Sequence, residues 1–545
     1  MKQWRLWTVM VGAMMLYGIL GFNLYTIQIK KNVYYAARAA SQFKAGGFLH
    51  ARRGNIYFTD KNNNEIPIAI NKEYQEIFAI PKEIENVPQT TRLVANALEL
   101  GISDVEILLR DPEDTYEIIV QKASTEQVGR LKQLGDTKGI YVQKREYRFY
   151  PFESLGAKVL GFVGLSNKDD EIRGRYGIEK EYEEHLQGIN GYFIEEDNEI
   201  IEPIHGKDIH LTIDRNIQAR VEEILDKLIQ KEDAESGVII IQEPATGKII
   251  AMAGGPGFNP NDYAQSEIKT FLNDATQSIY EPGSVFKPFT VAIGLDAGSI
   301  TPETTFHDTG SMKLNGETIR NWDLKAHGTV TISEIIENSI NTGAALVEQK
   351  IGHSTFKKYL KKFDIERPTE IELPNEITGS IANLDDVRDI NYATAAFGQG
   401  VAVTPLRLIA MISTIANDGV LMKPYLTSTG SPHKVREVIS AKAANEVTTM
   451  MVTAVKKAVV AYIPGYRIAG KTGTAQVPDF KLGGYTNEFI HTYAGFGPAS
   501  NPKFTILIKL DKPQQHVLAG QTVVPAFKEL AKFILNYYNI PPDDL

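Results

Sequence analysis

A serine and a lysine stand three residues apart in the segment 280–290, which reads YEPGSVFKPFT. Pro282 and Gly283 favour a sharp turn directly before Ser284. If a helix begins at Ser284, the side chain of Lys287 lies one turn away on the same face. A serine hydroxyl is a weak nucleophile until a base takes its proton, and a lysine amine is a base only when uncharged. Because the reference pKa of lysine is about 10.4, burial or a nearby cation must lower the pKa of Lys287.

The Ser-x-x-Lys spacing alone is not specific, because it recurs elsewhere in the chain. The other serines with this spacing are Ser41, Ser266, Ser354, Ser431 and Ser500. We interpret them as ordinary surface residues. Ser284 differs from them by the Pro-Gly turn before it, the apolar residues after it and two further motifs downstream.

The second motif is Ser339-Ile340-Asn341, the only Ser-x-Asn in the chain. Thr331 and Glu334 have the spacing of a capping box, which predicts a helix that continues through Ile340 and carries the motif. A helix-to-turn transition that uses Ser and Asn by chance is the alternative, and it is favoured for this motif taken alone.

The third motif, Lys471-Thr472-Gly473-Thr474, contains the only Lys followed by Ser or Thr and then Gly. It lies in the segment 466–476, which reads as a strand with small residues at its centre. Glycine within a strand allows another backbone to approach closely. A solvated edge strand is the alternative interpretation of this motif in isolation. Three such motifs in this order within one domain are hard to explain by chance.

Helical and β-type segments around the motifs predict a domain that starts near residue 206. Asp214 is a candidate cap for a helix whose apolar face includes Ile217, Val221 and Leu228. Alternating apolar runs bounded by turn residues indicate strands. The predicted strands are 209–213, 237–241, 248–252, 466–476, 492–497 and 504–510.

The preceding part of the chain, from about residue 44 to 205, mixes short β-type runs with helical ones. Residues 76–80 and 116–120 are typical of strands, and residues 91–100 of a helix. We find no arrangement of residues here that could do chemistry, so we interpret this part as structural.

Composition excludes several function classes. The 545 residues include 58 Lys and Arg and 67 Asp and Glu, a net charge of −9, which argues against nucleic-acid binding. The absence of cysteine excludes disulfides, thiolate metal sites and a cysteine nucleophile. The length suits two or three domains.

The N-terminus carries an uncharged, mostly apolar run at residues 6–29. As a helix it would be about 36 Å long, enough to cross a hydrocarbon core. A cleaved signal peptide is the alternative, and Ala37-Arg38-Ala39 resembles a cleavage site. We favour a retained anchor, because the run is longer than a signal h-region of about 7–15 residues. A short helix is predicted over residues 30–43.

Together the motifs resemble those of the penicillin-binding proteins, most closely the class B monofunctional peptidoglycan D,D-transpeptidases of the cell-division type. The resemblance covers nearly the whole chain, and its further motifs include residues 53–56, 177–179, 397–400 and 494–496. It implies an α+β fold with an N-terminal transmembrane helix, a mixed α/β pedestal (dimerisation-type) domain and a β-lactamase-like transpeptidase domain, whose antiparallel sheet is flanked by helices. The implied boundaries are a cytoplasmic tail at 1–5, an anchor at 6–29, the pedestal at 30–205 and the transpeptidase domain at 206–545.

The resemblance implies a role for each catalytic candidate. Ser284 would attack the carbonyl of the penultimate D-Ala of a stem peptide, and Lys287 would take its proton. Ser339 would relay a proton to the leaving amine, and Asn341 would orient Lys287 and the substrate amide. Lys471 would help to keep Lys287 neutral.

The resemblance also implies how the substrate is held. Lys471, Thr472 and Thr474 would bind the terminal carboxylate, with Gly473 in the same substrate-binding strand. The backbone amides of Ser284 and Thr474 would form the oxyanion hole. An amine from a neighbouring stem then resolves the acyl-enzyme into a cross-link, D-Ala is released, and no metal or organic cofactor is needed.

Partners and location follow from the same resemblance. We expect peptidoglycan stem peptides and inhibitory β-lactams as ligands, a polytopic membrane glycosyltransferase and other divisome proteins as partners, and no nucleic acid. The protein would sit in the cell membrane as a single-pass protein with its bulk outside the cytoplasm, in septal wall synthesis. We expect neither a glycosyltransferase domain nor an added wall-binding module. Ile340 stands where the family more often has Ser, and residues 58–64 match the pedestal pattern loosely.

Two alternatives stay open. A β-lactam-hydrolysing or β-lactam-sensing enzyme shares all three motifs and differs in how fast its acyl-enzyme is hydrolysed. A division scaffold that acts mainly by binding a polytopic glycosyltransferase is the second, and Gly12, Gly18 and Gly21 in the apolar run could permit close helix contact.

Overall fold

The computed structural model describes residues 3–26, 48–49, 51–114, 116–165, 172–194, 199–479 and 483–544. The chain forms two compact units. The first comprises Met1–Asn55, Ala69–Pro151 and Glu184–Asp208, and the second comprises Ile56–Ile68, Phe152–Glu183 and Ile209–Leu545. The helix predicted over residues 30–43 lies outside the described residues.

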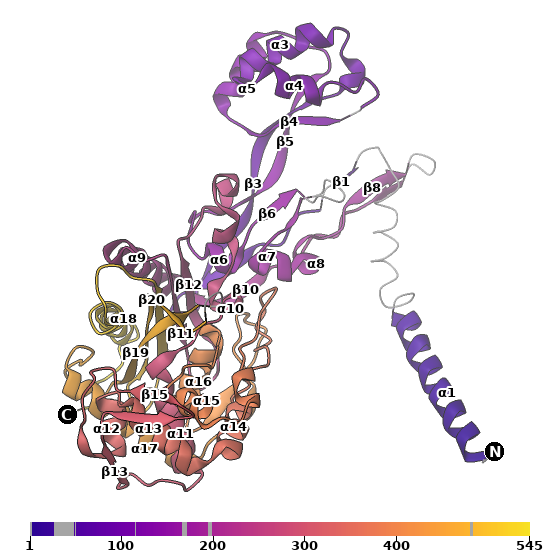
Figure 1. Cartoon of the computed structure of the whole chain (residues 1–545). Helices are drawn as coiled ribbons and strands as arrows, with labels where there is room; N and C mark the ends of the chain where they lie inside the picture. Colours follow the sequence, from indigo (N-terminus) through magenta and orange to yellow (C-terminus); the bar gives the residue numbers. More distant parts are fainter. Residues whose placement is uncertain are drawn as a thin grey trace. The chain divides into compact units, whose positions relative to one another are not determined.

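The second unit is built on a five-stranded sheet in the order β12-β11-β21-β20-β19, and every pair in it is antiparallel. The strands predicted at 237–241, 248–252, 466–476, 492–497 and 504–510 are therefore confirmed. The central strands are apolar without alternation because helices cover both faces of the sheet (Figure 1). The strands are β11 (Ser236–Gln242), β12 (Ile249–Gly255), β19 (Ala469–Pro478), β20 (Tyr485–Gly497) and β21 (Phe504–Asp511).

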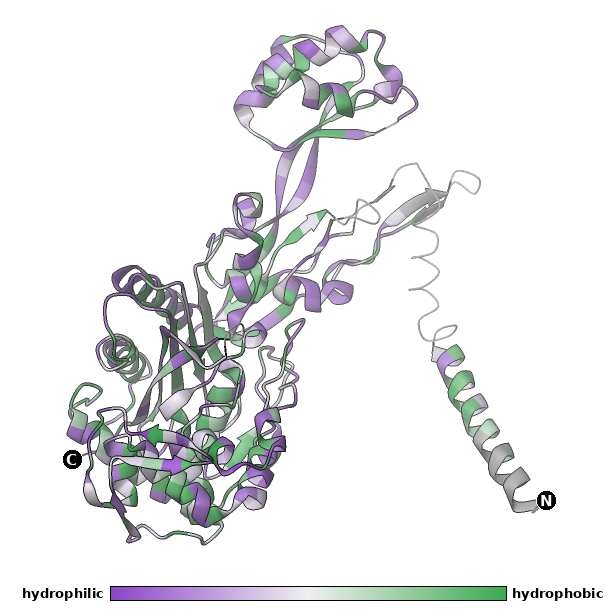
Figure 2. Ribbon diagram, viewed as in Figure 1, coloured by the Kyte–Doolittle hydropathy of each residue, from purple (hydrophilic) through white to green (hydrophobic). Residues whose placement is uncertain are grey.

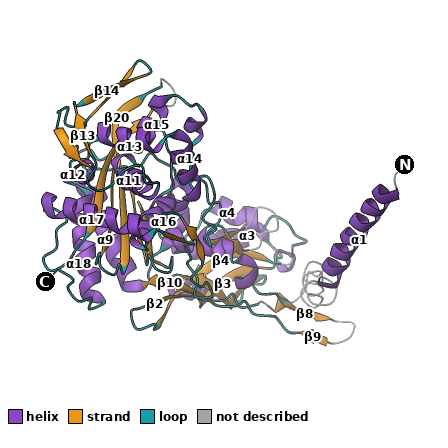
Figure 3. Cartoon of the chain, turned by 90° about the horizontal axis from the view of Figure 1, so that it is seen from below, coloured by secondary structure: helices purple, strands orange, loops and turns teal. Residues whose placement is uncertain are grey.

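One face of this sheet is covered by α9 (Arg215–Glu232) and α18 (Val523–Tyr537), as Figures 1 and 3 show. Asp214 caps α9 as predicted, because its carboxylate accepts hydrogen bonds from the backbone N–H groups of Asn216 and Ile217. The apolar stripe of α9 packs into a shared core with the sheet and α18.

The opposite face carries α16 (Pro405–Ala416) and α17 (Ala441–Ala458). α16 is buried on almost every side, as expected for a helix that is apolar all round. It contacts α10 (Asp274–Gln277) and α17. The helices α11 (Lys287–Asp296), α13 (Asn341–Ile351), α14 (His353–Lys362) and α15 (Asp389–Ala395) pack against one another, and Figure 2 shows green, hydrophobic residues among the helices of this unit.

Smaller elements complete the second unit. β2 pairs with β10 in parallel, and the other short strands form two-stranded antiparallel pairs. They are β2 (Ile56–Thr59), α6 (Ala157–Leu160), β6 (Val163–Leu165), β7 (Ile172–Gly174), α7 (Gly177–Glu181), β10 (Ile209–Asp214), β13 (Thr305–Asp308), β14 (Ser311–Leu314), β15 (Glu317–Arg320), β16 (Gly328–Thr331), α12 (Ile332–Glu337), β17 (Val420–Met422) and β18 (Lys434–Glu437).

The first unit contains residues 69–79 of the long strand β3 (Glu65–Ala79), which pair antiparallel with β4 (Glu117–Ala123) and β5 (Ile140–Phe149). Its helices are α3 (Val87–Leu98), α4 (Ile102–Leu108) and α5 (Thr125–Gln133), and they close a separate apolar core on the sheet (Figure 1). The strands and helix predicted in this part of the chain are confirmed. The remaining elements here are β1 (Phe48–Leu49), β8 (Gly191–Ile194) and β9 (Glu199–Ile201), while α8 (Glu183–Leu186) begins at the boundary between the units.

The N-terminal segment forms α1 (Gln3–Tyr25). Within the described residues, no helix combines the length and the apolar character that crossing a membrane requires. The anchor expected at residues 6–29 therefore stays a prediction, and its last three residues lie outside the described part.

Two predictions about the motif-bearing helices need correction. Ser284 does not begin an α-helix: Gly283–Phe286 form a 3₁₀ turn, and α11 begins at Lys287. Ser339 does not lie within a helix either. The capping box of Thr331 and Glu334 is present, but α12 ends at Glu337 and α13 begins at Asn341.

Candidate active site

The turn that carries Ser284 is held by a second loop of the chain. Gly283 has a φ of +57°, a conformation that glycine adopts without a steric penalty. Its N–H donates to the carbonyl of Gly398 at 3.1 Å. A Cβ on Gly398 would lie 2.3 Å from the carbonyl oxygen of Gly283, so the two loops fit only because both positions are glycine.

The amine of Lys287 lies at the centre of the three motifs. The side chain is fully buried, and its Nζ is 3.0 Å from the Oγ of Ser284. The same nitrogen is 2.5 Å from the carbonyl oxygen of Ser339, 3.0 Å from the Ser339 hydroxyl and 2.7 Å from Oδ1 of Asn341. The structure thus brings together the candidates from the first two motifs.

The four groups that contact the Lys287 amine determine which of them its N–H groups and its lone pair can serve. The carbonyl oxygens of Ser339 and Asn341 can only accept hydrogen bonds. A neutral amine has two N–H groups and one lone pair, so these two oxygens use both N–H groups. The lone pair is then left to accept from a hydroxyl, either that of Ser284 or that of Ser339. This geometry suits an amine that removes a proton from a neighbouring serine.

The break between α12 and α13 sets the position of Ser339. Ser339 has a φ of +57°, which costs a non-glycine residue roughly 1–3 kcal/mol and is found where surrounding contacts enforce it. A continuous helix would place Ser339 in an ordinary helical conformation. The break instead turns both its carbonyl and its hydroxyl towards Lys287.

Lys471 joins the site from β19, at the end of the strand order. Its side chain is buried, and its Nζ is 3.1 Å from the hydroxyl of Ser339. The same nitrogen donates to the carbonyl and hydroxyl oxygens of Thr472, at 3.2 and 3.4 Å. The Ser339 hydroxyl therefore lies between the two lysines, as a proton relay requires.

Burial and charge act on both amines. Burial lowers the pKa of Lys287 well below its usual value, and the charge of Lys471 lowers it further. Burial also lowers the pKa of Lys471, to about 7. The lowered pKa of Lys287 favours its uncharged form, the form in which an amine can act as a base.

Close packing joins β19 to the nucleophile turn. A Cβ on Gly473 would lie 2.7 Å from the carbonyl oxygen of Pro282 and 2.9 Å from the Val285 side chain. Gly473 thus lets the strand lie directly against the turn that carries Ser284. Thr474, one residue further, accepts a hydrogen bond through Oγ1 from the N–H of Ala519 at 3.2 Å.

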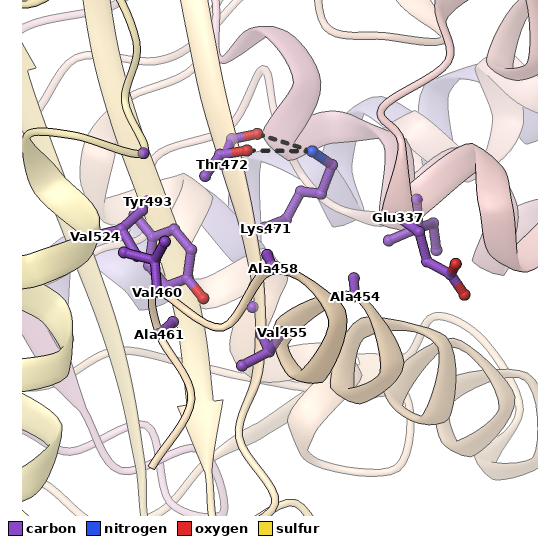
Figure 4. Close-up of a pocket in the computed structure, with 13 residues that line it drawn as sticks. Glu337, Ala454, Val455, Ala458, Val460, Ala461, Lys471, Thr472, Tyr493 and Val524 are labelled. Carbon is purple, nitrogen blue, oxygen red and sulfur yellow. Dashed lines mark hydrogen bonds between the residues drawn. The ribbon is translucent and has the colours of Figure 1, made fainter.

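A small cavity lies beside the third motif (Figure 4). It has a volume of about 100 Å³, and its lining includes Lys471 and Thr472 of β19, Tyr493 of β20 and Val455 of α17. Figure 4 shows the Lys471 side chain turned towards Thr472. The cavity borders β19, the strand that carries the third motif.

Sequence reasoning missed Asp308 and Asn321, two buried polar residues that hold the start of α13. Their hydrogen bonds join positions 13 to 34 residues apart. No local spacing or periodicity marks such contacts. The sequence predicts no strand at residues 317–320, where β15 directly precedes Asn321, so it offers no signal for this residue.

Comparison with known families and relatives agrees with this geometry. The family described as the penicillin-binding protein transpeptidase domain matches residues 237–532, and the penicillin-binding protein dimerisation domain matches residues 48–211. Stage V sporulation protein D of Bacillus subtilis is 29% identical over 95% of this chain and 83% of its own length. Peptidoglycan D,D-transpeptidase FtsI of Buchnera aphidicola is 30% identical over 90% of this chain and 88% of its own.

The fold is shared with solved structures as well. The crystal structure of penicillin-binding protein 3 from Mycobacterium tuberculosis, in complex with aztreonam, superposes with a TM-score of 0.70 at 24% identity and covers 91% of this chain and 98% of that one. The order of the three motifs, the Ser339 hydroxyl that both lysines contact and the two matched domains lead to one conclusion. The chain belongs to the penicillin-binding proteins of the transpeptidase family.

Proposed function

We propose that this chain is a peptidoglycan D,D-transpeptidase that cross-links stem peptides through an acyl-enzyme on Ser284. The observation that carries the proposal is the buried amine of Lys287, which lies 3.0 Å from the Ser284 hydroxyl and has a pKa lowered by burial and by the charge of Lys471. Relatives named as peptidoglycan D,D-transpeptidases support the substrate.

The first half-reaction forms the acyl-enzyme. Lys287 takes the Ser284 proton while Oγ bonds to the carbonyl carbon of the penultimate D-Ala. The C–N bond to the terminal D-Ala then breaks, and the leaving amine receives a proton through the Ser339 hydroxyl. The backbone amides of Ser284 and Thr474 stabilise the oxyanion, a contribution of about 3–4 kcal/mol for one donor in a studied protease.

The second half-reaction transfers the acyl group. An amine of a neighbouring stem attacks the ester, the C–O bond to Ser284 breaks, and a C–N bond forms the cross-link. The proton lost by the amine returns to the Ser284 oxygen through Lys287. Protonated Lys471, with Thr472 and Thr474 in the strand that contains Gly473, binds the terminal carboxylate of the donor stem.

A fluorescent penicillin tests this proposal. We expect stoichiometric labelling of the wild type and loss of labelling in Ser284→Ala, because a β-lactam acylates the same hydroxyl as D-Ala-D-Ala. Ser354→Ala is the matched control, since Ser354 also precedes a lysine by three residues. Mass spectrometry should map the adduct to the peptide containing Ser284. Equal labelling of Ser284→Ala and the wild type contradicts the proposal.

The lifetime of the acyl-enzyme separates transpeptidase from β-lactam hydrolase. A transpeptidase excludes water from the ester, so the penicilloyl adduct should persist for many minutes. Rapid turnover of penicillin would identify a β-lactamase instead.

The same proposal includes the location and the partners. α1 is the membrane anchor, residues 30–205 form the pedestal, and the transpeptidase domain from residue 206 works outside the cytoplasm in septal wall synthesis. Large apolar side chains along α1 support this, since Met14, Leu16 and Phe22 are 66%, 65% and 68% exposed. A polytopic glycosyltransferase would contact α1 where Gly18 and Gly21 have open space beside them.

A further inference from the structure

The helix that carries Asn341 lacks an N-terminal cap of its own. The N-cap position of α13 is Ile340, whose side chain cannot accept a hydrogen bond. The carboxamide of Asn321 supplies the missing acceptor from 20 residues earlier in the chain. Its Oδ1 accepts from the backbone N–H of Asn341 at 3.0 Å and from that of Thr342 at 3.2 Å.

Asp308 fixes which way the Asn321 carboxamide points. Oδ2 of Asp308 accepts from Nδ2 of Asn321 at 2.8 Å. Because an ionised carboxylate only accepts hydrogen bonds, Asn321 must present its nitrogen to Asp308 and its oxygen to α13. Oδ1 of Asp308 also accepts from the Thr342 hydroxyl at 2.6 Å, which joins the carboxylate directly to the first turn of the helix.

The carboxylate of Asp308 accepts four hydrogen bonds. Besides Asn321 and Thr342, it accepts from the backbone N–H groups of Gly310 and His327, each at 2.9 Å. Asp308 and Asn321 are 1% exposed and Thr342 is 3% exposed. Burial acts to raise the pKa of Asp308, but these hydrogen bonds outweigh it and hold the pKa below its ordinary value.

The network continues to the catalytic amine. Nδ2 of Asn341 donates to the carbonyl of Arg320 at 2.9 Å, next to Asn321 in the chain. With its nitrogen held there, Asn341 presents Oδ1 to Lys287 at 2.7 Å. Three buried residues outside the motifs therefore determine the position of Oδ1 of Asn341, one of the two carbonyl oxygens that accept hydrogen bonds from Lys287.

We propose that Asp308, Asn321 and Thr342 are positioning residues for acylation, which hold Asn341 so that its side-chain oxygen orients the amine of Lys287. This inference rests on the proposed function, because it assigns Lys287 the role of base. Asp308 acts through Asn321 and α13 and touches neither the substrate nor the reacting atoms.

The test compares Asp308→Asn with Asp323→Asn. Asp323 lies in the loop that begins at Asn321, where it contacts Lys325 and His327 instead of α13. The rate constant for acylation by a fluorescent penicillin is measured from pH 5 to 9, with the folded fraction taken from circular dichroism. For Asp308→Asn we expect the acylation rate constant to fall on the order of tenfold or more, since small misplacements of catalytic groups can lower a rate by up to 10²-fold. Asp323→Asn should react like the wild type.

The pH profile separates positioning from mere loss of structure. The Asn341 oxygen favours the charged form of Lys287, because a hydrogen bond to the charged form stabilises it. Displacing that oxygen lowers the pKa of Lys287 further, so the rising limb of the profile should move to lower pH in Asp308→Asn. Partial unfolding would lower the rate and leave the limb in place.

A second pair of variants keeps the test decisive if Asp308→Asn does not fold. Thr342→Val removes the hydroxyl that donates to Asp308, so this variant should acylate slowly and show the same shift of its pH profile. Thr342→Ser keeps a hydroxyl and should show the wild-type rate and pH profile. Wild-type kinetics in Asp308→Asn or Thr342→Val, or a loss that only follows the folded fraction, overturns the inference. An unlabelled wild type instead contradicts the proposed function itself.

Discussion

At the scale of single residues, the proposed chemistry depends on two lysines whose amines contact the same hydroxyl. Ser339 Oγ lies 3.0 Å from Lys287 Nζ and 3.1 Å from Lys471 Nζ. Two ammonium groups this close in a buried site repel each other. The charge of Lys471 accordingly lowers the pKa of Lys287, so one amine can be a base while the other stays a cation for the substrate carboxylate.

We predict a bell-shaped pH dependence for penicillin acylation by the free enzyme. The rate rises as pH passes the pKa of Lys287, because the base must lose its proton. It falls as pH passes about 7, because Lys471 must keep its proton to bind the carboxylate. The measurement is the second-order acylation rate constant against pH.

Lys471→Arg is the control for the falling limb. A guanidinium stays protonated throughout the working range, so this variant should lose the limb near pH 7 even if its maximal rate is lower. An unchanged alkaline limb in Lys471→Arg would assign that limb to another group.

At the scale of elements, the site is made where three elements end or meet. The nucleophile stands on a 3₁₀ turn before α11, the second motif fills the break between α12 and α13, and the third lies on the last strand of the sheet. Element ends leave backbone groups without partners inside the helix, so carbonyls such as that of Ser339 can turn to a catalytic amine.

We predict that Gly473→Ala slows acylation by about ten- to a hundredfold, because a misplacement of about 1 Å can cost up to 10²-fold. The new Cβ would lie 2.7 Å from the Pro282 carbonyl oxygen, and β19 must move away from the turn that carries Ser284. Thermal unfolding should show a cost of only about 1–3 kcal/mol, as for other overpacked sites.

Gly257→Ala is the matched control for this prediction. Gly257 has open space around the Cβ position, so the substitution should leave both the acylation rate and the unfolding temperature near wild type. A Gly473→Ala variant that acylates at the wild-type rate would show that the close approach of β19 is not required.

At the scale of the whole molecule, the chemistry is confined to the second unit. All three motifs and the buried network of Asp308 lie between Ile209 and Leu545, within that unit. The first unit has its own core and its own sheet. This separation fits a protein whose first unit and N-terminal helix determine where the reaction takes place.

We predict that Met14→Lys reduces membrane association of the full-length protein. A lysine at the centre of a spanning helix costs about 2.5–3.5 kcal/mol on insertion scales. Cell fractionation followed by penicillin labelling measures the share of labelled protein that sediments with membranes and is released only by detergent.

Asn23→Lys is the control, because a lysine near the helix end can extend its charge to the interface. This variant should remain with the membrane. Release of the wild type by high salt alone would contradict an inserted anchor.

The sequence by itself determined the family, the order of the motifs and most of the strands. Local patterns suffice for these: the turn before Ser284, the cap at Asp214, the capping box at Thr331 and the apolar runs of the central sheet. The break at Ser339 was not predictable from the sequence, because the capping box favours a continuous helix through Ile340 and that preference is local. Ser339 instead adopts a φ of +57°, and its carbonyl contacts Lys287, 52 residues away. Only the tertiary structure decided that Asn321 caps α13 and that Asp308 orients Asn321, since a hydrogen bond between distant segments leaves no periodic trace in the chain. It also decided the direction in which the pKa values of Lys287 and Lys471 shift, because a pKa depends on burial and on neighbouring charges, which a sequence does not contain.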